Sequence, residues 1–259
     1  MIRVENLHLH FGGIRAVDGV SVEIEEESIT GLIGPNGAGK TTLFNVIAGV
    51  YPPSEGRVFL QEQEITGLKP HQLFHRGVLR TFQIAHEFSS LTVLENLTTV
   101  PGGQAGETLV NAWFRRGKVR VQEAEIRDRA WDVVTFLGLE RVATERAGAL
   151  SGGQKKLLEL GRTMMAEPQI VFLDEVGAGV NRTLLRSIGD AILRLNRERG
   201  YTFCMIEHDI DFISRLCQPV IVMAEGKVLT QGSPAEVKAD QRVIDSYLGR
   251  GRRRGASAS

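Results

Sequence analysis

The chain has 259 residues, 42% of them hydrophobic, which is enough to bury the core of one large domain or of one domain with a helical insert. Its 31 Lys and Arg balance 31 Asp and Glu, so no global field exists to attract nucleic acid or an anionic membrane, and any anion site must be local. The charged start of the chain and the lack of a run of about eighteen apolar residues predict a soluble protein with no signal peptide and no membrane span.

The first strands are predicted by alternation of apolar and polar residues over Val4–Leu9 and Val20–Ile24, with a turn at Gly12-Gly13. They indicate a half-exposed antiparallel sheet. Later strands have a different character, because they are short and continuously apolar. Such runs are typical of parallel strands buried on both faces of an α/β core, and they occupy Ile29–Ile33, Ile170–Leu173, Tyr201–Ile206 and Val220–Met223.

A glycine-rich loop directly follows the run that ends at Ile33. It matches the strand, loop and helix pattern that binds the phosphates of a nucleoside triphosphate, with the residues Gly34, Pro35, Asn36, Gly37, Ala38, Gly39, Lys40, Thr41 and Thr42. We expect Lys40 to reach the β- and γ-phosphates and Thr41 to be a ligand of Mg²⁺. A simple glycine turn with a helix cap would need neither the lysine nor the hydroxyl.

Helical patterns dominate from about residue 68 to 166, where Thr92–Glu95 predicts a capping box and Val119–Leu137 a long charged helix. We expect a single domain over residues 1–250 that contains this helical insert, with a strand and short helices over Val228–Leu248. Residues 251–259 are expected to form a disordered basic tail. Cys204 and Cys217 have no metal-binding spacing and are expected to be reduced packing residues.

Two carboxylates, Asp174 and Glu175, end the predicted strand at Ile170–Leu173. Acidic pairs often cap helices, but together with the glycine-rich loop they predict a catalytic pair. Asp174 is expected to hold Mg²⁺, and Glu175 to be the base that orients the attacking water.

The sequence Leu150-Ser151-Gly152-Gly153-Gln154 lies before that strand, and at this point the chain resembles the ATP-binding cassette (ABC) family. The resemblance implies that these residues face the γ-phosphate held by an opposite subunit, so that two chains enclose two ATP molecules. It further implies that Gln83 joins the metal shell, that His208 contacts the γ-phosphate and that Phe11 stacks on adenine, where relatives often have tyrosine. These motifs run from Phe11 to His208, which is most of the chain.

One segment departs from the family pattern, because Val176 follows Glu175 where many relatives have proline. Together with Gly177 and Gly179, it predicts a more flexible but still working loop up to Asn181.

Weaker features resemble the ATP-binding subunits of branched-chain amino-acid importers, and amide and urea importers share much of this pattern. The features are Phe11–Gly13, Arg80–Gln83, Leu91–Leu97, Ala178–Asn181, Tyr247–Gly249 and the long stretch between Leu97 and Leu150. An ATPase of the lipopolysaccharide-exporter type is an open alternative. Non-transport cassettes are less favoured, because the chain has no long coiled-coil insert and no second cassette.

The resemblance implies transmembrane permease subunits, a second ATPase subunit of the same or a sibling chain, and indirectly a solute-binding protein as partners, with no nucleic acid. It implies a cytoplasmic protein held at the inner face of the membrane. A permease helix would dock beside Gln83, where Phe82, Ile84, Phe88 and Leu91 either form an apolar wall or merely pack the insert.

Overall fold

A computed structural model describes residues 1–81, 87–107, 113 and 115–253, with side chains described as far as Tyr247. The chain separates into two compact units. The first unit comprises Met1–Thr81, Gln169–Gly177 and Ile192–Ser259, and the second comprises Phe82–Pro168 and Ala178–Ala191.

An antiparallel sheet opens the first unit, with the strand order β2-β1-β4-β5. Its strands are β1 (Ile2–Phe11), β2 (Ile14–Ile24), β4 (Glu55–Leu60) and β5 (Gln63–Glu64). Phe11 pairs with Ile14 across the predicted turn, so the antiparallel pair is confirmed, although both strands are longer than predicted. The strand ends beside the turn, His10–Phe11 and Ile14–Arg15, are exposed, so apolar alternation does not mark them.

A second, mostly parallel sheet completes the first unit, with the order β10-β9-β3-β8-β7-β6. Its strands are β3 (Ile29–Ile33), β6 (Val78–Arg80), β7 (Ile170–Asp174), β8 (Thr202–Ile206), β9 (Val220–Ala224) and β10 (Lys227–Gly232). Every residue of β3, β7 and β8 is buried, as the continuous apolar runs predicted. Only β10 is antiparallel to its neighbour, and the predicted α/β fold class is confirmed.

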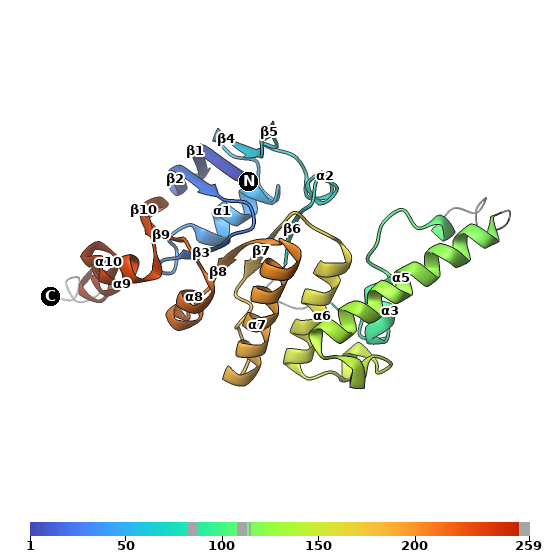
Figure 1. Cartoon of the computed structure of the whole chain (residues 1–259). Helices are drawn as coiled ribbons and strands as arrows, with labels where there is room; N and C mark the ends of the chain where they lie inside the picture. Colours follow the sequence, from blue (N-terminus) through green and yellow to red (C-terminus); the bar gives the residue numbers. More distant parts are fainter. Residues whose placement is uncertain (82–86, 108–112, 114, 254–259) are drawn as a thin grey trace. The chain divides into compact units, whose positions relative to one another are not determined.

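The helix α1 (Lys40–Ile47) lies between these two sheets (Figure 1). Its Leu43 and Phe44 join one continuous core with residues of both sheets, and the rings of Phe44 and Phe172 meet edge to face at 5.0 Å. The other helices of this unit are α2 (Pro70–Phe74), α8 (Ile210–Leu216), α9 (Pro234–Ala239) and α10 (Gln241–Arg253). This core fixes the start of α1 against the ends of the parallel strands.

The second unit is built from helices that pack on one another: α3 (Val93–Thr98), α5 (Arg116–Leu137) and α6 (Gly152–Met165). The predicted capping box is confirmed at α3, where the Thr92 hydroxyl accepts from Glu95 N. The predicted long helix is confirmed as α5. Helix α7 (Arg182–Arg199) begins in this unit and ends in the first one.

Strand β6 lies within the range expected for the helical insert, yet it pairs with β7 in the parallel sheet. Three residues are too few to show a strand pattern, so β6 could not be predicted from the sequence.

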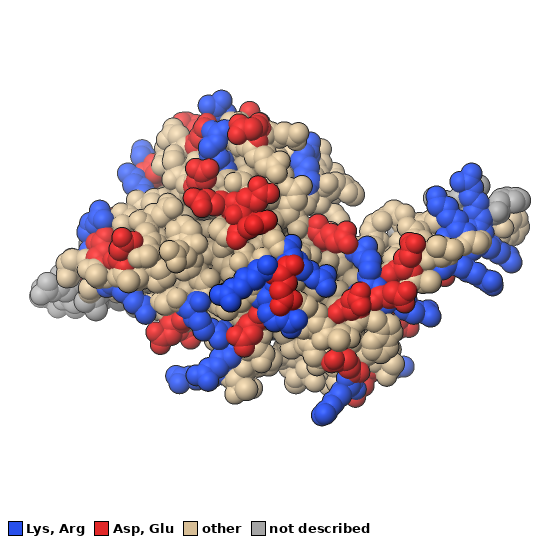
Figure 2. All heavy atoms as spheres, viewed as in Figure 1, with Lys and Arg blue, Asp and Glu red and all other residues tan. Residues whose placement is uncertain are grey.

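Both cysteines are buried and free, and burial raises the pKa of each thiol, which confirms them as packing residues. None of the helices in the described part of the chain has the length and hydropathy needed to cross a bilayer. Lys and Arg lie beside Asp and Glu over much of the face drawn in Figure 2, in keeping with the balanced composition.

Candidate active site

The glycine-rich loop joins β3 to α1, as predicted. Gly34 has φ 147° and Gly39 has φ 98°, a region that side chains disfavour. A Cβ atom would lie 2.0 Å from the Met223 carbonyl oxygen at Gly34, and 2.3 Å from the Ala16 carbonyl oxygen at Gly39. Both positions therefore require glycine, and the loop is pressed against β9 and β2.

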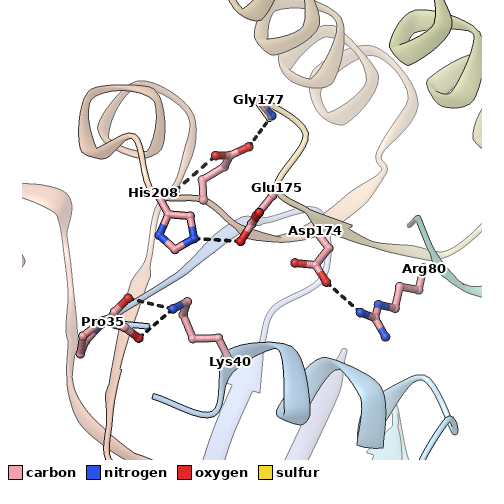
Figure 3. A network of polar contacts seen from close by, with 9 residues as sticks. Pro35, Lys40, Arg80, Asp174, Glu175, Gly177 and His208 are labelled. Atoms are coloured by element: carbon pink, nitrogen blue, oxygen red, sulfur yellow. Dashed lines mark hydrogen bonds and ion pairs between the residues drawn. The ribbon is translucent and has the colours of Figure 1, made fainter. Parts of the chain in front are cut away.

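Lys40 is buried at the start of α1, and its ammonium group lies under the loop. Nζ donates to the carbonyl oxygens of Gly34 at 2.8 Å and Pro35 at 3.1 Å (Figure 3). Among the described residues no side chain caps the first turn of α1. Its N–H groups and the positive end of the helix dipole face a cavity of about 150 Å³, whose lining is residues 36–42, Glu175 and His208. This arrangement suits a phosphate group.

Asp174 and Glu175 stand at the end of β7, where Asp174 is buried. Its Oδ2 accepts from Arg80 Nη2 at 2.7 Å, and Arg80 also contacts the Asn45 amide oxygen on α1. Its Oδ1 is buried and has no hydrogen-bond partner among the described residues. A buried carboxylate oxygen without a partner is costly, so the site fits a cation that would bind there.

Glu175 and His208 point toward one another above the loop (Figure 3). His208 Nε2 lies 2.8 Å from Glu175 Oε1. Glu175 has φ 51°, a left-handed conformation that is rare outside glycine, and its N–H donates to the Ile206 carbonyl at 2.9 Å. The bond to β8 holds the backbone in this conformation and aims the carboxylate into the cavity.

Glu207 is a neighbour of this pair that none of the sequence motifs predicted. Its carboxylate accepts from Gly177 N at 2.7 Å and from His208 N at 3.3 Å, so it joins the loops after β7 and β8. Burial raises the pKa of Glu207, while the two backbone hydrogen bonds oppose that shift. The sequence signal that could have predicted Glu207 is a carboxylate placed between a buried strand and His208.

The raised pKa of Glu207 gives a prediction for stability. Its folded pKa exceeds the unfolded one, so its favourable contribution is present below the ordinary value of 4.5 and is lost as pH rises through the folded pKa. We expect Glu207→Gln to gain thermal stability relative to the unmodified chain between pH 5 and pH 8, measured as melting temperature.

Glu95→Gln is the opposite control for that measurement. Hydrogen bonds from the Thr92 backbone and hydroxyl lower the pKa of Glu95, so its contribution is present above 4.5 and is lost at lower pH. If the difference in melting temperature between Glu207→Gln and the unmodified chain did not grow with pH, burial of the charged Glu207 carboxylate would not be destabilising.

The Ser151 sequence begins α6 in the second unit. The Ser151 hydroxyl accepts from Gln154 N at 3.4 Å, and Gln154 Oε1 accepts from Ser151 N at 2.9 Å, which forms a capping box. Ser151 and Gly152 are exposed. Gly153 is buried, and a Cβ atom there would lie 1.3 Å from Leu184 Cδ2, so any larger residue at this position would have to displace the Leu184 side chain.

Phe11, a further expected residue, does not line this cavity. Phe11 is 46% exposed at the end of β1, with its ring edge to face with Tyr51 at 5.4 Å. Gln83 lies outside the described residues, together with Phe82 and Ile84 of the expected docking wall. Phe88 is half exposed and packs under the Arg162 guanidinium.

The loop, Lys40 and the paired carboxylates at the strand end define a nucleoside triphosphate-binding protein of the phosphate-loop class. Comparison with known proteins narrows this class. The ABC transporter family profile matches residues 17–178, and the profile of branched-chain amino acid ATP-binding cassette transporters matches residues 227–252. The chain belongs to the ABC transporter family, and it is an ATP-binding cassette ATPase.

One curated relative is a probable branched-chain amino acid transport ATP-binding protein LivG of Methanocaldococcus jannaschii. It is 38% identical over 253 residues, which cover 96% of this chain and 97% of the relative. A solved ADP conformation of an ABC transporter cassette has a TM-score of 0.81 and 35% identity, covering 96% of this chain and 98% of the other. A dimeric post-hydrolysis cassette bound to ADP and Pi has a TM-score of 0.72 and 25% identity, covering 90% and 99%.

Proposed function

We propose that this chain hydrolyses ATP to drive import of branched-chain amino acids through separate permease subunits. The observation that carries the proposal is full-length similarity to a branched-chain amino acid transport relative, together with the match of residues 227–252 to the corresponding profile. The intact loop, carboxylates and His208 support turnover rather than passive nucleotide binding.

In the proposed reaction, Lys40 binds the terminal phosphates of ATP, and the N–H groups at the start of α1 bind the remaining phosphate oxygens. Glu175 orients the attacking water and accepts its proton, while His208 contacts the γ-phosphate. The 2.8 Å contact between His208 Nε2 and Glu175 Oε1 supports the proposal that both side chains act on the same phosphate group. Phe11, exposed at its strand end, is available to stack on adenine.

Mg²⁺ is part of this proposal. Thr41, which is exposed at the start of α1, and the unpaired Oδ1 of Asp174 would hold it, with Gln83 as a third partner. The ion would neutralise charge that develops on the phosphates.

We further propose that two cassettes act as a pair. The exposed Ser151 and Gly152 begin the 14-residue helix α6, so the positive end of its dipole is available to an anion. In the proposed pair they face the phosphates bound by the partner cassette. The dimeric structure of a relative bound to ADP and Pi supports this arrangement. The partner is a copy or a sibling chain.

Residues 1–250 would then act as one cassette, with the second unit as the helical insert that meets the permease. The chain would be held at the cytoplasmic face of the membrane by that permease, and a solute-binding protein would deliver the substrate. The supporting observation is the transport role in the relative's name.

The cargo is tested with the whole complex, purified from native membranes through a tag on this chain and reconstituted in liposomes. We expect uptake of radiolabelled leucine that depends on ATP at the cassette side and is absent with Glu175→Gln. Uptake of urea or acetamide in place of leucine would overturn the branched-chain assignment, while leaving the ATPase assignment intact.

A further inference from the structure

Three side chains with metal-binding chemistry lie on one face at a corner of the antiparallel sheet. His8 and His10 alternate along β1 and so share a face, and Asp18 on β2 is the register partner of His8. One donor atom from each of the three lies within 4.8 Å of the others. None of these residues takes part in the nucleotide chemistry described above.

The spacing of the His8 and Asp18 donor atoms matches a metal better than a hydrogen bond. His8 Nδ1 lies 3.4 Å from Asp18 Oδ1, whereas a charge-assisted hydrogen bond is about 2.7–2.9 Å long. In a tetrahedral zinc site with bonds of about 2.0–2.1 Å, neighbouring ligand atoms are roughly 3.3–3.4 Å apart. The two atoms already stand where two zinc ligands would be.

Asn6 orients the His8 ring in the way that an outer partner of a metal ligand does. His8 Nε2 lies 3.2 Å from Asn6 Oδ1, which can only accept, so Nε2 carries the hydrogen. The lone pair of Nδ1 then faces the Asp18 carboxylate. Asn6 has φ 44° at an irregularity in the β1 pairing, and this bend brings its amide beside His8. A cation between Nδ1 and Oδ1 would satisfy both acceptors.

Two cations of the protein also contact Asp18. Lys227 Nζ lies 3.2 Å from Oδ2, which is not the carboxylate oxygen nearest His8 Nδ1, and so leaves Oδ1 available. Arg15 Nη1 lies 3.6 Å from Oδ1, but its side chain is 69% exposed and can turn into water. Metal binding must displace Arg15, which therefore competes with the metal.

We propose that His8, His10 and Asp18 form a binding site for Zn²⁺, with water as the fourth ligand. Two imidazole nitrogens and one carboxylate oxygen suit zinc better than Mg²⁺ or Ca²⁺, which prefer all-oxygen sites. The site clamps β1 to β2, next to Phe11.

The test uses the full chain, stripped of metal with a chelator and free of nucleotide. Zn²⁺ binding is measured by equilibrium dialysis, and coordination by the visible absorption of the Co²⁺ form. We expect the chain to bind one Zn²⁺, which raises its melting temperature, and the Co²⁺ form to show a tetrahedral spectrum. The variant His8→Ala/His10→Ala should lose Zn²⁺ binding, the rise in melting temperature and the Co²⁺ spectrum. Mg²⁺ should produce neither effect.

Three further variants sharpen the result. Asn6→Ala should weaken Zn²⁺ binding about 10–100-fold, as loss of an outer partner does. Arg15→Ala should strengthen it, because the competing cation is gone. His71→Ala/His75→Ala, which removes one exposed histidine within α2 and another directly after it, should leave Zn²⁺ binding unchanged.

Unchanged Zn²⁺ uptake in the folded His8→Ala/His10→Ala variant would overturn the site, as would no uptake by the unmodified chain. Because the readouts are metal content and spectrum, the result is independent of ATP turnover.

Discussion

Glu175→Gln is expected to lower the turnover of ATP by about 10²–10⁴-fold while ATP binding survives. The amide cannot accept a proton from the attacking water, but it keeps the size of the side chain and can still contact His208. The sequence of the nucleotide-binding loop is unchanged, since Glu175 lines the cavity from the position directly after β7 whereas the loop joins β3 to α1. The variant should therefore accumulate as an ATP-bound pair.

Phosphate release measures turnover in this variant, and light scattering during size-exclusion chromatography measures pairing. Glu225→Gln is the matched control, because Glu225 has a similar left-handed backbone, φ 50°, in the turn between β9 and β10. The control should turn over ATP normally. Undiminished turnover by Glu175→Gln would exclude Glu175 as the base.

The parts of this site that could be predicted from the sequence are those in which neighbouring residues carry the chemistry. The glycine-rich loop is a local pattern, because Gly34 and Gly39 are required by the backbone conformation and by close packing. Continuous apolar runs in the sequence predict the buried strands. The order of β3, β7 and β8 places the loop, Glu175 and His208 at the same edge of the sheet, since parallel strands share their carboxyl ends.

Other parts depend on contacts between residues that are distant in sequence. Arg80 pairs with Asp174, 94 residues later, only because the short β6 adds to the edge of β7. No local pattern marks that strand or shows that one carboxylate oxygen is neutralised while the other is left without a partner.

The departure at Val176 has a structural counterpart that the sequence did not reveal. The N–H of Gly177, the next residue, donates to the buried Glu207 carboxylate. The loop after Glu175 is thus attached to the loop that carries His208, 30 residues away. This contact supplies a restraint where the rigid ring of proline is absent, and the expected flexibility of the loop stays a prediction.

Lys40→Ala is expected to weaken ATP binding roughly 10–150-fold, since one hydrogen bond to a charged group contributes about 1.5–3 kcal/mol. Turnover should fall further, by about 10²–10³-fold, because the ammonium also stabilises charge that develops on the phosphates. The group is well placed for both effects. Lys40 is 6% exposed, and in the structure its Nζ contacts carbonyl oxygens of the loop, from which it can turn to a phosphate.

Titration with a fluorescent ATP analogue and phosphate release measure the two effects separately. Lys40→Arg is the matched variant: it keeps the positive charge, but its planar fork is too large for a cavity of about 150 Å³ that must also hold phosphate, so turnover should remain low. Lys69→Ala, at the exposed start of α2, should leave both quantities unchanged. If Lys40→Arg restored full turnover, charge alone would explain the role of Lys40. If Lys40→Ala bound ATP normally, the phosphates would have to be held by the loop and the dipole of α1 without it.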